Sequence, residues 1–165
     1  ERVDSLTLAE AASCLTNSTF SPHFKEQAKH LVGSVELKLG QAQDLSPLRT
    51  VEVVDILETL GSWHRARRGK PAPLVGGSKL AERLDRILVE RKVELLYTGN
   101  VSLWIIAVQA FARMDCVGAE WPRVALEFAG DKLFVEKVSF YQQCDLVEAL
   151  SRLGLFDEGA YRNIA

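Results

Sequence analysis

The chain has few cysteines, few prolines and no long apolar run, and each of these absences excludes a class of protein. Its 3 cysteines, Cys14, Cys116 and Cys144, are widely spaced and odd in number, which indicates neither a disulfide framework nor a zinc site. We expect them to be small buried apolar residues in a reducing compartment. Because no run of about 18 apolar residues occurs, we also expect no insertion into a membrane.

An excess of one charge is missing as well. The 165 residues include 20 basic and 22 acidic ones, which gives a formal net charge of -2. This balance excludes a general electrostatic attraction to nucleic acid or to anionic membranes, so any such binding would need a local basic patch. The hydrophobic fraction of 47% excludes a chain that is disordered throughout.

Helical periodicity is the main positive pattern. Apolar residues recur at spacings of three and four, and no segment alternates cleanly as a half-buried strand does. Carboxylates mostly lie beside basic residues at helical spacing, such as Glu82 with Arg86, or Glu90 with Glu94 and Arg91, and are expected on exposed faces. The apolar stripes run over residues 8–15, 24–35, 53–60, 80–88, 104–111, 124–128 and 146–153.

Residues that begin and end helices flank these stripes. Thr7 and Glu10 fit a capping box, in which each side chain binds the other residue's backbone N–H. Ser46–Pro47 and Asn100 are expected to mark the starts of two further helices. Glycine is expected to end a helix at three positions, which are Gly40, Gly61 and Gly154.

Four of the helical segments resemble one another. Each of these five-residue segments begins with two small or branched residues and ends with a large apolar residue. These last residues, Leu15, Leu57, Phe111 and Leu150, lie 42, 54 and 39 residues apart. A glycine- and proline-rich insertion near residues 65–77 accounts for the longest spacing. The period is then about 40 residues, as in proteins built from stacked helix pairs.

We therefore predict an all-α fold, a right-handed α-solenoid of about four antiparallel helix pairs. An irregular helical bundle, whose amphipathic helices look alike by chance, is the alternative. The whole of residues 1–165 is expected to form one helical-repeat domain and to be a fragment of a longer chain. The expected units are residues 5–40, 46–97, 99–137 and 138–165.

Two segments carry a family resemblance. Residues 110–115 (AFARMD) and 148–154 (EALSRLG) resemble the first helix of heptatricopeptide and octotricopeptide-like repeats, and residues 57–61 are a weaker copy. Such repeats occur in organellar RNA-binding proteins, including RAP-domain proteins. The resemblance implies an organellar, mitochondrial setting, with the cytoplasm as the alternative, and a role in RNA processing or at the ribosome. No RAP-domain sequence is visible in the chain.

A basic cluster lies within the second expected unit, residues 46–97. Arginine forks match phosphate oxygens, and a base can stack on a tryptophan ring, so the cluster is a candidate site for nucleic acid or an acidic partner. The alternative is a solvated helix end whose cations complement the helix dipole. The cluster comprises Trp63, His64, Arg65, Arg67, Arg68 and Lys70.

No residue pattern indicates a catalytic, cofactor or metal site. His23 and His30 could share a helix face, but no third ligand stands in register with them. No serine–histidine or cysteine–histidine pair follows from the spacings. We therefore expect no catalytic residue, no cofactor and no metal ligand.

Large aromatic residues outside the basic cluster divide into two groups. Trp104 and Trp121 fall within apolar stripes and are expected to be packing anchors between helices. Residues with a large apolar side chain near the end of the chain are candidates for a protein interface. These candidates are Tyr141, Tyr161 and Ile164.

These patterns favour a non-catalytic helical-repeat scaffold with protein partners, in an organellar RNA-processing or ribosome-associated assembly. The net charge of -2 supports this hypothesis, because RNA-binding solenoids need a basic concave face. A direct RNA-binding repeat module that uses the basic cluster is the alternative, with RNA as a further partner. An all-α enzyme is the second alternative.

Overall fold

The computed structural model describes residues 7, 10, 11, 13, 33, 34, 36–66, 77–97, 100–131 and 137–164. These residues form helices and turns and contain no strand, so the prediction of an all-α protein is confirmed. None of their helices is both long and apolar enough to cross a membrane. Residues 36–41 are helical, and the labelled helices after them are α3 Thr50–Ala66, α4 Gly77–Glu90, α5 Lys92–Tyr97, α6 Val101–Arg113, α7 Trp121–Ala129, α9 Phe140–Arg152 and α10 Glu158–Ile164.

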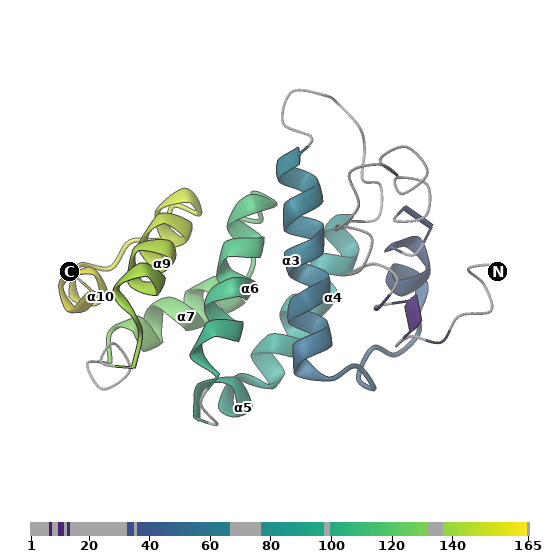
Figure 1. Cartoon of the computed structure of the whole chain (residues 1–165), viewed down its shortest axis with the longest axis horizontal. Helices are drawn as coiled ribbons and strands as arrows, with labels where there is room; N and C mark the ends of the chain where they lie inside the picture. The colour runs from purple at the N-terminus through teal and green to yellow at the C-terminus, as the bar shows by residue number, and fades with distance from the viewer. Residues whose placement is uncertain are drawn as a thin grey trace.

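These helices lie in two layers (Figure 1). In the first layer α3, α6 and α9 lie side by side, and each contacts the next. In the second layer α7 contacts α4 on one side and α10 on the other. Successive helices α3 and α4, α6 and α7, and α9 and α10 therefore form pairs with one member in each layer. The short helix α5 connects the first of these pairs to α6.

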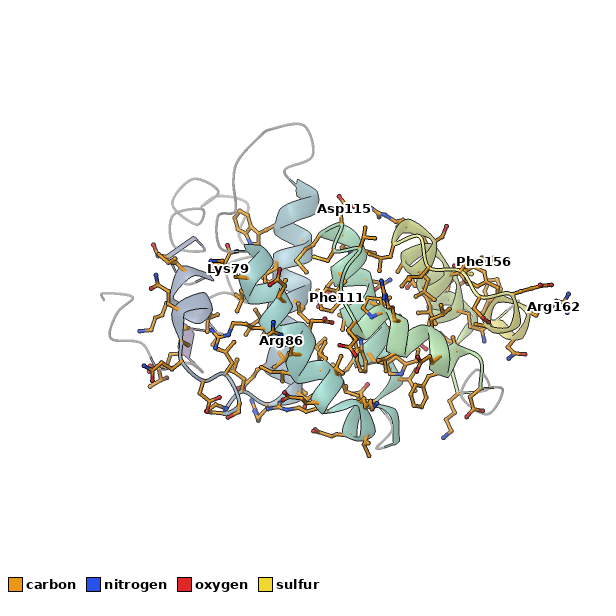
Figure 2. All side chains as sticks on the ribbon, turned by 180° about the vertical axis from the view of Figure 1, so that it is seen from behind. Lys79, Arg86, Phe111, Asp115, Phe156 and Arg162 are labelled. Atoms are coloured by element: carbon orange, nitrogen blue, oxygen red, sulfur yellow. The ribbon has the colours of Figure 1, made fainter. Side chains whose placement is uncertain are left out.

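Two tryptophans anchor the core, as predicted. Trp104 on α6 and Trp121 on α7 are both fully buried. The indole N–H of Trp121 donates to the carbonyl oxygen of Trp104 over 3.3 Å. Phe111, in the last turn of α6, belongs to the same buried cluster (Figure 2). The hydrogen bond between the two tryptophans joins the two layers within the pair formed by α6 and α7.

Gly61 does not end a helix, so that prediction was wrong. Helix α3 continues past it to Ala66, and Gly61 is buried where α3 crosses α6. A Cβ atom at this position would lie 3.1 Å from both the Cα and the carbonyl oxygen of Ala110. The glycine is therefore needed for the close approach of two helix backbones.

The second layer is tied across its pairs by capping contacts. Asp85, a buried residue of α4, accepts backbone N–H bonds from Glu120 and Trp121 at the start of α7, both over 2.8 Å. The α7 helix has no cap of its own, because the side chain of Glu120 makes no capping hydrogen bond. At the other end of α7, the Asn163 amide of α10 donates to the Gly130 carbonyl oxygen over 2.8 Å. Each neighbouring pair therefore satisfies one terminus of α7.

Hydrogen bonds from a side chain to backbone groups at a helix end also join α4 to the helix over residues 36–41. The guanidinium of Arg83 donates to the Gly40 carbonyl oxygen over 2.8 Å, at the end of the helix over residues 36–41. Arg91 donates to the carbonyl oxygens of Ser46 and Leu48 over 2.8 and 2.7 Å. Arg91 is half-buried and not exposed as expected, because its side chain binds the turn before α3, whereas Glu82, Arg86 and Glu90 are exposed as expected.

The turns that end α6 and α9 have the same geometry. The N–H of Cys116 donates to the Phe111 carbonyl oxygen, and that of Leu155 to the Leu150 carbonyl oxygen, each over 3.0 Å. The residue just before each donor has a positive φ, 55° at Asp115 and 69° at Gly154. These are the same six-to-one turn, in which the residue with positive φ is usually glycine. The two turns lie 39 residues apart in the sequence.

Replacing Asp115 by glycine is expected to raise the free energy of unfolding by about 0.5–1 kcal/mol, because glycine adopts a positive φ without steric cost. The matched change at the other turn, Gly154→Ala, is expected to lower it by about 1 kcal/mol for the converse reason. Urea unfolding of the two variants checks both signs. A loss of stability in Asp115→Gly would contradict the assignment of this turn.

The helix-start and cysteine predictions had mixed outcomes. The Thr7–Glu10 capping box is confirmed, with the N–H of Thr7 2.7 Å from a Glu10 carboxylate oxygen and the N–H of Glu10 3.3 Å from the Thr7 hydroxyl. Asn100 does precede α6 but makes no side-chain capping bond. The Ser46–Pro47 signal placed the start of the helix too early in the sequence, because α3 begins at Thr50. Cys144 is exposed, which contradicts its expected burial.

Candidate interaction surfaces

The neighbouring helices α6 and α9 enclose a polar groove on the first layer. Its volume is about 150 Å³, and it opens to solvent. Both helices supply charged side chains, so the groove carries cationic and anionic groups together. The α6–α9 groove is lined by Gln109, Ala112 and Arg113 from α6 and by Asp145, Glu148, Ala149 and Arg152 from α9.

One face of α9 continues this groove toward the start of the helix. Asp145, Glu148 and Arg152 line the groove, and Tyr141 lies four residues before Asp145. Spacings of four, three and four place all four residues on one helix face. Tyr141 is 80% exposed, so this face of α9 carries an accessible aromatic ring about one turn before the first groove residue.

The residue that caps the start of α9 also fixes the position of α9 against α6. Ser139 and Gln142 form a capping box, in which the N–H of Ser139 donates to the Gln142 side-chain oxygen over 3.0 Å. The amide nitrogen of the same Gln142 donates to the Ser102 hydroxyl on α6 over 2.8 Å. The Gln142 side chain thus both starts α9 and attaches it to the neighbouring helix.

One ion pair in the groove is long and exposed to solvent. Arg152 and Glu148 lie on successive turns of α9, with 3.8 Å between the guanidinium nitrogen and the carboxylate oxygen. The Glu148 side chain is 74% exposed, so this ion pair is worth little in isolation. A partner's charged groups can replace such a contact at small cost.

The predicted basic cluster lies mostly outside the described residues. Trp63 is half-buried against the core, and its indole N–H is buried with no hydrogen-bond partner within the described part of the chain. Its ring is therefore only partly available for stacking. The backbone of His64 and Arg65 belongs to the last turn of α3, whereas their side chains are outside the description. Arg67, Arg68 and Lys70 fall outside the described residues altogether.

The three predicted interface residues occupy different environments. Tyr141 is exposed on α9, as above. Tyr161 is half-buried on α10, where its hydroxyl donates to the Leu155 carbonyl oxygen over 3.1 Å and its ring lies 4.7 Å from that of Phe156. Ile164 is the last residue of α10, and its side chain is outside the description. The structure does not bring the three residues together as one described surface.

Two further aromatic residues near the end of the chain are exposed, and the sequence analysis did not single them out. Phe140 and Phe156 are each 72% exposed. Phe156 lies in the turn between α9 and α10, at the same end of the molecule as Arg162 (Figure 2). Phe140 contacts Tyr141 edge to face, with 6.1 Å between ring centroids. Phe140 begins α9 and Phe156 follows its end, and both lie outside the apolar stripe of that helix. This position is the signal from which the sequence could have indicated that they are exposed.

The pKa shifts of Asp85 and Cys116 follow from the burial of these side chains and from the groups around them in the fold. Burial raises the pKa of the Asp85 carboxyl group. The hydrogen bonds that it accepts from two backbone N–H groups lower this pKa by a smaller amount. Burial also raises the pKa of the Cys116 thiol to about 11, helped by the nearby carboxylates of Asp85 and Asp115. Cys116 is therefore a protonated, unreactive thiol at neutral pH. Within the described ranges, no group of three or more His, Cys, Asp or Glu residues could hold a metal ion.

Fold and surfaces together define the chain as an all-α protein with a charged groove between neighbouring helices of one layer. Comparison with protein-family models, curated proteins and solved structures found no significant match.

Proposed function

We propose that the protein is a scaffold built from stacked antiparallel helix pairs, and that it binds a segment of a partner protein in the α6–α9 groove. The groove, with the exposed Tyr141 on the same face of α9, is the observation that carries this proposal. No enzymatic reaction forms part of it.

The repeated turns support the stacked architecture. Helices α6 and α9 begin and end 39 residues apart, and they end in turns with the same hydrogen bond. Within each layer a helix packs against its counterpart from the next pair. A right-handed α-solenoid of about four helix pairs, of which the last three lie near residues 46–97, 99–137 and 138–165, accounts for these features, since such units bury their faces against neighbours.

The chemistry of the groove favours a protein segment over RNA. Asp145 and Glu148 oppose the approach of phosphate groups, whereas Arg113 and Arg152 can bind carboxylates. A polypeptide segment that carries both acidic and basic side chains can form ion pairs with the two arginines and with the two carboxylates of the groove. Tyr141 adds a large side chain of the type that is enriched in protein interfaces.

The cellular setting of this proposal is an organellar RNA-handling assembly. Its support is the resemblance of residues 110–115 and 148–154 to heptatricopeptide-type repeats. These are the segments that contain the two equivalent turns. The scaffold would serve such an assembly through protein contacts, and direct RNA binding through the basic cluster is the competing outcome.

Photo-crosslinking inside the source cells tests the proposal. An aromatic photo-crosslinking residue at position 141 is expected to give discrete adducts with another protein that protease removes and nuclease leaves intact. The same residue at position 93, where Val93 of α5 is 63% exposed, is the control and is expected to give none. The groove variant Arg152→Glu should reduce the adducts at position 141.

Three outcomes would contradict the proposal. The first is the absence of adducts at position 141, and the second is an adduct of the chain with itself alone. The third is a nuclease-sensitive adduct together with salt-sensitive RNA binding that is lost when Arg65, Arg67 and Arg68 are all changed to alanine. That third result would establish the RNA-binding alternative.

A further inference from the structure

The charges of the α6–α9 groove lie in a fixed order along its length. The two helices run in the same direction, because the hydrogen bond from Gln142 to Ser102 joins their starts. Arg113 and Arg152, which both line the groove, lie in their last turns. Asp145 lines the groove seven residues before Arg152, which is about 10 Å along the axis of α9. The groove is therefore cationic where the helices end and anionic about two turns earlier.

The two carboxylates of the groove differ in their surroundings. Glu148 lies 3.8 Å from the guanidinium of Arg152, with which it forms an ion pair. Asp145 is exposed, and its carboxylate forms no ion pair with any residue in the described part of the chain. A cation from a partner can therefore bind Asp145 without replacing an existing contact.

Tyr141 and Asp145 together form a site for a basic side chain. The two residues are four apart on α9, which places their Cβ atoms about 6 Å apart on one face of the helix. The side chain of Tyr141 is as accessible as that of Asp145. A lysine or arginine side chain can therefore pair with the carboxylate and contact the aromatic ring at the same time.

We propose that the groove recognises its partner by charge order, with an acidic side chain at the arginine end and a basic side chain at Asp145 and Tyr141. This inference rests on the proposed function, because it defines the segment that the groove binds. In the polyproline II conformation, which unfolded segments commonly adopt, residues three apart lie on one side of the chain and about 9 Å from each other. We therefore expect the acidic and the basic residue to be three positions apart in the partner.

Selection of random twelve-residue peptides displayed on phage against the full chain is the first test. Peptides that are enriched on the wild type and lost on Arg152→Glu bind in the groove. We expect these peptides to share an acidic and a basic residue three positions apart. If no peptide behaves in this way, the proposed function itself is contradicted, and the inference fails with it.

Fluorescence anisotropy of one selected peptide then tests which charge each end of the groove binds. Asp145→Asn is expected to weaken the peptide three- to fivefold, but to have no effect on a peptide whose basic residue is replaced by alanine. Arg152→Gln should show the same coupling with the acidic residue and none with the basic one. Tyr141→Leu should weaken binding several-fold more than Tyr141→Phe, which keeps the aromatic ring.

Glu90→Gln is the matched control, since Glu90 is an exposed carboxylate on α4 in the second layer, and it should leave peptide binding unchanged. All the substituted residues are exposed, so the variants should keep the wild-type circular dichroism spectrum. Groove-binding peptides whose basic residue shows no coupling to Asp145 would overturn the inference and leave the proposed function standing. Coupling of Asp145 to the acidic residue instead would overturn it as well.

Discussion

Replacing Asp85 by alanine is expected to lower the free energy of unfolding by about 2–3 kcal/mol. Its carboxylate accepts the N–H groups of Glu120 and Trp121, and the Trp121 N–H is buried. Helix α7 has no side-chain cap of its own, so alanine leaves both donors without a protein partner. Urea unfolding measures the loss, and amide hydrogen exchange at residues 120 and 121 should accelerate more than in α3.

Two matched variants isolate this capping contact. Asp85→Asn keeps one carbonyl acceptor and is expected to lose less than half as much stability. Glu82→Ala, on an exposed position of the same helix, should change the free energy of unfolding by under about 0.5 kcal/mol. Equal losses in Asp85→Ala and Glu82→Ala would show that the contact does not hold α7.

The raised pKa of Asp85 gives this effect a pH dependence. A carboxyl group whose native pKa is raised stabilises the fold most when it is protonated in both states. That contribution falls as pH rises from the ordinary aspartate range through the raised native pKa. The stability difference between the wild type and Asp85→Ala should therefore be larger at acid pH than at neutral pH.

Replacing Gly61 by leucine is expected to destabilise the protein by about 1–3 kcal/mol. The new Cβ would lie 3.1 Å from two backbone atoms of Ala110, which cannot rotate away as a flexible side chain would. The helices α3 and α6 must then separate, which disturbs the first layer. Thermal or urea unfolding checks the result.

Gly40→Leu is the control for this substitution. Gly40 is also helical, but a Cβ there meets no atom within 4 Å. Since leucine is the better helix former by about 0.8 kcal/mol, this variant should be as stable as the wild type or slightly more stable. If Gly61→Leu behaved like Gly40→Leu, the close crossing of α3 and α6 would be wrong.

The sequence predicted helices well where apolar periodicity and packing agree. The stripe through Trp104 and Phe111 became the buried face of α6, because a spacing of three and four needs no distant partner to be recognised. Gly61 shows the limit of local reasoning. A glycine near a helix end usually stops the helix, but here contact with Ala110, 49 residues away, overrides that preference.

The interaction surfaces were less predictable than the helices. Tyr141 was singled out because it is a large aromatic residue, and it is exposed beside the groove. The groove itself depends on which residues of α6 and α9 meet, so Arg113 and Asp145 could not be joined from sequence spacing. The capping role of Asp85 is equally non-local, since its two donors lie 35 and 36 residues further along the chain.

One measurement tests the two-layer stack most directly. In nuclear Overhauser spectra of the isotope-labelled protein, we expect cross-peaks between Gly61 Hα and the Ala110 protons, which report the first layer. We also expect cross-peaks between the Asp85 Hβ protons and the Trp121 amide proton, which report the second layer. Helical chemical shifts throughout with neither set of cross-peaks would contradict the stack and indicate an irregular bundle.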